Sequence, residues 1–133
     1  MNTSNTVKTN KYSVLLVEDE LLVQKIHYRF LEILDCAIVV AMDGEEALKK
    51  AKEESFDLIF MDVGLPLIGG VEVITMIREN EQINKINPVP IIVLTAYKEE
   101  KVFQDCLKAG ANAVHLKPLN FEGFTDLINQ YCK

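Results

Sequence analysis

Apolar runs and amphipathic stretches alternate along this chain. Five runs are short, mostly apolar and rich in β-branched residues, as buried strands are: residues 12–17, 37–41, 56–61, 91–94 and 113–116. In the stretches that follow them, apolar residues return every three or four positions, which is typical of a helix packed on one face. The pattern therefore predicts strands and helices in regular alternation.

Cap and turn residues mark the ends of the expected helices. Asp43, with Glu46 three residues later, predicts the start of the second helix, and Gly110 stands where the fourth would end. The polar, proline-flanked stretch 80–90 predicts a loop. The expected apolar stripes are Val23, Ile26, Phe30 and Leu34; Ala47, Leu48 and Ala51; Val71, Ile74 and Ile77; Val102, Phe103, Cys106 and Leu107; and Phe124, Leu127, Ile128 and Tyr131.

Nearly continuous apolar strands alternating with helices indicate an α/β fold whose parallel sheet is covered on both faces. Right-handed crossovers leave few topologies, and we expect the flavodoxin-like, doubly wound five-stranded order 2-1-3-4-5. The length of 133 residues suits one domain, expected over residues 11–133. Residues 1–10 are polar and predict a tail or a linker.

Charge and composition exclude several classes of protein. The net charge is −6 and no basic cluster is present, which argues against direct binding of nucleic acid. No apolar run approaches the roughly 20 residues of a membrane span, so we expect no membrane contact. Three widely spaced cysteines, Cys36, Cys106 and Cys132, are typical of reduced thiols, and we expect a cytoplasmic protein.

Polar side chains stand at the ends of four expected strands. Glu18 and Asp19 follow the first strand, Asp62 the third, Thr95 the fourth and Lys117 the fifth. In an open parallel sheet these ends meet at one edge, beside the crevice where ligands bind. The sequence therefore predicts one pocket that holds three carboxylates, a hydroxyl and an ammonium.

This set of groups suits a divalent cation and a phosphoryl group. Three carboxylates in one crevice repel one another, and Mg²⁺ (or Mn²⁺) would relieve that repulsion. Asp62 is then a candidate nucleophile that forms an acyl phosphate. Lys117 could neutralise the phosphoryl oxygens and Thr95 could donate a hydrogen bond to them. Glu18 and Asp19, taken without Asp62, could equally be solvated loop residues.

From about Lys11 onward, the chain resembles the receiver domain of two-component response regulators, which includes chemotaxis regulators. The matching segments keep receiver-like order and spacing, and they are residues 15–20, 57–66, 90–96, 109–111 and 116–118. The resemblance implies that Asp62 is the phosphoacceptor. It also implies that Asp19, Asp62 and the carbonyl of Gly64 ligate the metal, with Glu18 acting partly through water. Thr95 and Lys117 would bind the phosphoryl group.

The resemblance also implies partners and a mode of action. The phosphoryl donor would be a phosphohistidine on a histidine kinase or a histidine phosphotransfer protein. The domain would assist its own phosphorylation and dephosphorylation, switch partner binding, and not act as an enzyme on other substrates. Residues 20–26 resemble receivers fused to hybrid sensor kinases. Val114 departs from the family pattern, because receivers often carry an aromatic switch residue there. The oligomeric state is not indicated.

Two other classes of protein fit these residues less well. A dehalogenase-type aspartyl-phosphate phosphatase would carry a second acid where Gly64 stands, and a flavin module would not place acids after its first strand. A receiver that docks without taking phosphate stays open. Tyr97 is interpreted as a partly exposed loop residue, with a position that covers part of the pocket as the alternative. His27 and His115 are interpreted as packing or solvent-exposed residues, because a relay histidine needs a helical bundle.

Overall fold

The computed structural model of the protein describes residues 10–64 and 69–132. Within them, five parallel strands form one sheet in the order β2-β1-β3-β4-β5, which confirms the predicted topology. The strands are β1 (Tyr12–Val17), β2 (Cys36–Ala41), β3 (Leu58–Asp62), β4 (Ile91–Thr95) and β5 (Ala113–Leu116). The helices are α1 (Leu21–Ile33), α2 (Gly44–Glu53), α3 (Gly70–Asn84), α4 (Glu100–Ala109) and α5 (Phe121–Tyr131).

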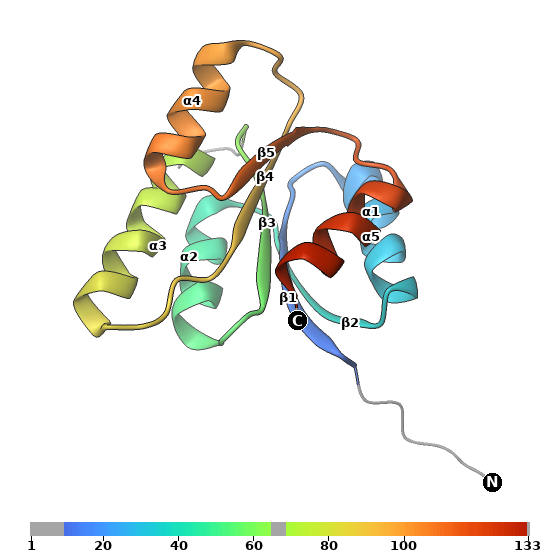
Figure 1. The fold of residues 1–133 in the computed structure, drawn as a ribbon, viewed down its shortest axis with the longest axis horizontal. Helices are drawn as coiled ribbons and strands as arrows, with labels where there is room; N and C mark the ends of the chain where they lie inside the picture. Colours follow the sequence, from blue (N-terminus) through green and yellow to red (C-terminus); the bar gives the residue numbers. More distant parts are fainter. Residues whose placement is uncertain (1–9, 65–68, 133) are drawn as a thin grey trace, which may run out of the picture.

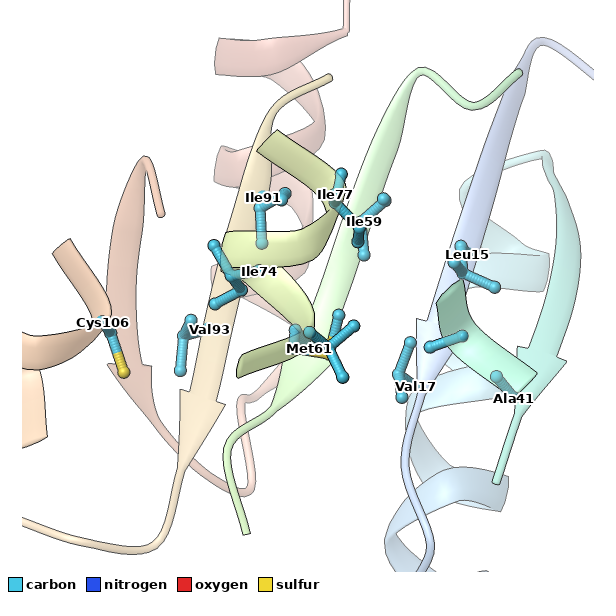
Figure 2. Close-up of a cluster of buried hydrophobic side chains, with 12 residues drawn as sticks. Leu15, Val17, Ala41, Ile59, Met61, Ile74, Ile77, Ile91, Val93 and Cys106 are labelled. Atoms are coloured by element: carbon cyan, nitrogen blue, oxygen red, sulfur yellow. The ribbon is translucent and has the colours of Figure 1, made fainter. Parts of the chain in front are cut away.

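The helices cover both faces of the sheet. Figure 1 shows α2, α3 and α4 on one face and α1 and α5 on the other. Alternate residues of each strand point into the two layers of hydrophobic core, one on each face of the sheet. Leu15 and Val17 of β1 face α2–α4, whereas Val14 and Leu16 face α1 and α5. Figure 2 shows the first layer, where side chains from β1, β3 and β4 meet Ile74 and Ile77 of α3.

The predicted caps are present, with one change of partner. Asp43 Oδ1 accepts a hydrogen bond from the Glu46 N–H, and Glu46 Oε1 accepts from the N–H of Met42 rather than from Asp43. Gly110 ends α4 with a φ of 120°, a conformation that favours glycine. Asn120 caps α5 by accepting from the Gly123 N–H. These caps set where the loops between strands and helices begin and end.

One residue of the expected stripe on α1 was placed wrongly. Ile26 is 40% exposed, whereas His27 and Leu31 are fully buried. Residues four apart lie on one helix face, so Val23, His27 and Leu31 form a continuous stripe that Ile26 does not share. The polar character of His27 concealed this face in the sequence.

The loop predicted over residues 80–90 is also partly wrong, because α3 continues to Asn84. Glu81 is buried and holds this last turn: it pairs with Arg78 Nη1 at 2.8 Å and accepts a hydrogen bond from the Val89 N–H. Arg78 in turn donates to the carbonyl of Gly110 at the end of α4. Polar residues here build the end of a helix instead of a loop.

Candidate functional site

The register of the sheet brings the polar strand ends to one edge. Asp62 pairs with Leu94 across β3 and β4, and Thr95 pairs with Leu116 across β4 and β5. β3 and β4 each run one residue further than predicted, so Asp62 and Thr95 are the last residues of their strands. Because all strands are parallel, Lys117 follows at the same edge.

Three acids meet at this edge. Glu18, Asp19 and Asp62 each offer a carboxylate oxygen, and these oxygens all lie within 4.8 Å of one another. Glu18 and Asp62 are buried, at 1% and 3% exposed, whereas Asp19 is exposed. Two buried acids therefore form the floor of the group, and the exposed one stands nearest to solvent.

Lys117 is the cation that compensates part of this charge. Its Nζ donates to Asp62 Oδ2 at 2.9 Å and to both carboxylate oxygens of Glu18 at 3.1 Å. One ammonium cannot neutralise three carboxylates. The described site therefore retains an excess of negative charge whenever all three acids are ionised.

The pKa values reflect this excess. Burial, followed by the charge of Asp62, raises the pKa of Glu18 to about 7. Burial and a hydrogen bond with Asp62 raise the pKa of Asp19. Burial lowers the pKa of Lys117, but its bonds to Asp62 and the charge of Asp62, together with Glu18, outweigh burial and raise the pKa overall. The site thus favours an additional positive charge, supplied by a proton or by a metal.

The loop after β3 fixes the Asp62 carboxylate from the other side. The Gly64 N–H donates to Asp62 Oδ1 at 3.0 Å. Gly70, at the start of α3, lies so close that an added Cβ would stand 2.5 Å from the Asp62 carbonyl oxygen and 2.7 Å from Val63 Cα. The sequence alone gives no sign of this close approach of Gly70 to Asp62. Leu65 and Pro66 of the predicted turn lie outside the described residues.

Thr95 and Tyr97 lie beside the acids. Thr95 is fully buried, and its Oγ1 accepts from the Tyr97 N–H at 3.0 Å, so its hydroxyl hydrogen remains to be donated. Among the described residues, this hydroxyl bonds neither the acids nor the Lys117 ammonium. Tyr97 is 52% exposed, and its ring lies 3.8 Å from the position of a Cβ built on Gly64. It is the partly exposed loop residue that the sequence predicted, and its ring also stands at the rim of the site, the alternative that the sequence left open.

His27 is a residue near the site that sequence reasoning did not connect with it. It is fully buried in α1, and its Nε2 accepts the N–H of Leu119, two residues after Lys117. His115, by contrast, is half-buried on β5. A single histidine within an amphipathic helix gives no sequence signal for such a contact.

Comparison with known proteins gives the family. The model of the response regulator receiver domain family matches residues 14–129. The chain belongs to this family. Curated relatives that this receiver resembles include the transcription factor SKN7 of Chaetomium thermophilum, 34% identical over 131 residues, and the autoinducer 2 sensor kinase/phosphatase LuxQ of Vibrio vulnificus, 39% identical over 113 residues. These matches cover 96% and 85% of the chain but only 16% and 13% of the relatives' own lengths.

Solved receiver domains share the fold over most of the chain. The receiver domain of Saccharomyces cerevisiae Ssk1, crystallised with the histidine phosphotransfer protein Ypd1, superposes with a TM-score of 0.86 at 32% identity, covering 92% of this chain and 90% of the other. The receiver domain of the Pseudomonas aeruginosa sensor histidine kinase PA1611, which has a magnesium ion coordinated in its active site cleft, gives 0.81 at 30% identity, covering 90% and 96%. In the described part of our receiver, no helix is long and apolar enough to cross a membrane.

Proposed function

We propose that this receiver takes a phosphoryl group from a phosphohistidine onto Asp62 and thereby changes its partner binding. The observation that carries the proposal is the buried Asp62 carboxylate, which lies beside two further acids and is held by Lys117. The donor is a histidine kinase or a histidine phosphotransfer protein, the kind of partner crystallised with the Ssk1 receiver. Relatives such as LuxQ support a place in a hybrid kinase or phosphorelay, and we place the reaction in the cytoplasm.

The residues at the site fit Mg²⁺. Carboxylate oxygens are its preferred protein ligands, and it typically takes one or two of them together with waters and phosphate oxygens. Glu18, Asp19 and Asp62 would hold the ion, with the carbonyl of Gly64 as a further ligand; the oxygens of the three acids already lie within 4.8 Å of one another. Mn²⁺ prefers the same oxygen ligands. When bound, the metal supplies positive charge that offsets the acids and the phosphoryl oxygens.

Asp62 is arranged to act as the nucleophile. Its Oδ1 accepts from the Gly64 N–H and its Oδ2 from Lys117, so the carboxylate is held in one orientation. In the transfer, one carboxylate oxygen bonds to phosphorus, the bond from phosphorus to the donor imidazole breaks, and its electron pair returns to the imidazole nitrogen. Such a reaction depends mainly on positioning and on charge stabilisation. The receiver thus serves as phosphoacceptor and assists the reaction of its own side chain.

Lys117 and Thr95 respond to phosphorylation of Asp62 by binding the new phosphoryl group. Once Asp62 is an acyl phosphate, it no longer offers the Lys117 ammonium a full carboxylate, and the ammonium is free to bind a phosphoryl oxygen. The unused hydroxyl hydrogen of Thr95 can bind another. Both residues stand at the ends of β4 and β5, so this binding favours one of two arrangements of that part of the fold. Val114, half-buried against the α2–α4 layer, replaces the aromatic switch of many receivers.

Transfer from a phosphorylated histidine phosphotransfer protein tests the proposal. We expect radiolabel to move to the receiver when Mg²⁺ is present and to stop moving when EDTA removes the metal. Binding of the phosphorylated protein without any transfer of label would instead support a receiver that only docks.

A further inference from the structure

His27 joins helix α1 to the segment that carries Lys117. The imidazole is fully buried, and its ring packs edge-on against Phe124 with centroids 4.8 Å apart. Its Nε2 accepts a hydrogen bond of 3.2 Å from the N–H of Leu119. Because Pro118 has no N–H, this is the first backbone donor after Lys117.

The hydrogen bond fixes the chemical state of His27. An accepting Nε2 requires a neutral ring with its proton on Nδ1. Burial, with a contribution from the charge of Lys117, lowers the pKa of His27 to about 4, so the ring is neutral near pH 7. Within the described residues, Nδ1 has no hydrogen-bond partner. A buried N–H left without a partner costs at least as much free energy as one hydrogen bond returns. Stability alone therefore gives no advantage to histidine over leucine at this position.

The backbone around Lys117 is held on both sides. The Lys117 N–H donates to the carbonyl of Thr95 at 2.9 Å, and the Leu119 N–H donates to His27. The lysine side chain itself is a flexible four-carbon stem. The place that its ammonium reaches between Asp62 and Glu18 therefore depends on how firmly these two anchors hold the backbone.

We infer that His27 is a positioning residue for phosphoryl transfer: by holding Leu119, it keeps Lys117 where the ammonium reaches Asp62. This inference rests on the proposed function. The role belongs to the acceptor nitrogen, so a side chain of similar volume without an acceptor will not replace it. The acids that would bind the metal follow β1 or end β3, and this contact does not hold them. When the contact is lost, the affinity for Mg²⁺ should therefore stay the same or increase.

The test compares His27→Leu with His27→Gln in the whole chain, with acetyl phosphate as donor and saturating Mg²⁺. In His27→Leu we expect the rate of phosphorylation of Asp62 at saturating donor to fall about tenfold, since small misplacements of a reacting group cost up to a hundredfold. The affinity for Mg²⁺ should stay the same or increase, and the denaturation midpoint should change little. His27→Gln places an amide oxygen near the former Nε2 and should recover most of the rate, whereas the shorter His27→Asn should not.

Leu31→Val is the matched control. Leu31 is equally buried on the same face of α1, one turn later, so this variant should lower stability and leave the rate unchanged. A wild-type rate in His27→Leu overturns the positioning role, and so does a rate that falls in proportion to stability in every variant. If His27→Leu does not fold, equal rates in the Gln and Asn variants overturn it. If the wild type takes up no phosphoryl group, the proposed function fails together with the inference; if it does and His27→Leu matches it, only the inference fails.

Discussion

The Lys117 ammonium donates a hydrogen bond of 2.9 Å to the Asp62 carboxylate across the end of β4, although 55 residues separate the two in the sequence. The same ammonium also donates to the carboxylate of Glu18, the residue that follows β1. One cation therefore links the ends of β1, β3 and β5. In the structure, Lys117 therefore provides part of the positive charge that the acids require.

Replacement of Lys117 should separate metal binding from phosphoryl transfer. Lys117→Met removes a cation that competes with Mg²⁺ for the same carboxylates, so the affinity for Mg²⁺ should stay the same or increase. The rate of phosphorylation by acetyl phosphate should fall about tenfold or more, because a charge-stabilising group is lost. Calorimetric titration with Mg²⁺ and a labelling time course measure the two effects.

Lys101→Met is the control for this variant. Lys101 lies on the exposed face of α4, where it pairs with Asp105 at 3.2 Å. Its loss should change neither quantity measurably. Loss of Mg²⁺ binding in Lys117→Met would show that the lysine builds the metal site, which contradicts the role given to it here.

Glu18 should make the metal-free protein less stable as the pH rises. Its pKa is about 7 in the folded protein against an ordinary 4.5, so the folded state binds the proton more tightly. The stabilisation is complete below pH 4.5 and is lost as the pH rises through 7. Relative to Glu18→Gln, the wild type in EDTA should lose about 3 kcal/mol of unfolding free energy over this range. Added Mg²⁺ should restore stability at high pH.

His27 has the opposite effect on the pH dependence of stability. The wild type is therefore compared with Glu18→Gln, which keeps His27. Its pKa of about 4, below the ordinary 6.5, means that its contribution is present above pH 6.5 and is lost as the pH falls toward 4. When the unfolding free energies of the wild type and Glu18→Gln, measured with urea, are subtracted at matched pH values, the contribution of His27 cancels. A difference between the two proteins that did not vary with pH would rule out a raised pKa for Glu18.

Gly70 should tolerate no side chain. A Cβ there would stand 2.5 Å from the Asp62 carbonyl oxygen, and both contacts are with backbone that cannot move aside cheaply. We expect Gly70→Ala to lower the unfolding free energy by roughly 2–4 kcal/mol and to slow phosphorylation, since Asp62 must shift. Gly69→Ala is the control, because among the described residues its Cβ would meet only the Val63 carbonyl oxygen, at 4.0 Å. Equal stability of the two variants would contradict this packing.

Tyr97 should shield the phosphorylated site from water. Its ring lies beside Gly64, next to the Asp62 carboxylate, so removal of the ring opens the rim. We expect the phosphoryl group on Tyr97→Ala to hydrolyse about threefold faster than on the wild type. Tyr97→Phe keeps the ring and should keep the lifetime. An unchanged lifetime in the alanine variant would mean that water reaches the site by another route.

The convergence of Asp62 and Lys117 could be predicted because it follows from the sheet alone. Continuous apolar runs such as those before Asp62 must lie in the interior of a parallel sheet, and parallel strands place their carboxyl ends on one edge. The carboxylates, the hydroxyl and the ammonium could therefore be placed together from sequence. Distances, and the way that Lys117 is shared between Asp62 and Glu18, could not.

The remaining features depend on contacts between residues far apart in sequence. The end of α3 is held by Glu81 through the backbone of Val89, and the mostly polar residues 80–84 look like a loop when read locally. The His27–Leu119 hydrogen bond joins residues 92 positions apart, and the local sequence around neither residue predicts it. The sequence shows which residues are polar, whereas only the structure shows which of them are satisfied by one another.

The central claim is that Asp62 accepts the phosphoryl group, and peptide mapping by mass spectrometry after reaction with Mg²⁺ and acetyl phosphate tests it most directly. We expect one phosphoryl group on Asp62 in the wild type and none in Asp62→Asn. Asp57→Asn should be labelled like the wild type, because Asp57 is exposed at the opposite end of β3. A phosphoryl group that persisted in Asp62→Asn, or a wild type that stayed unlabelled, would contradict the claim.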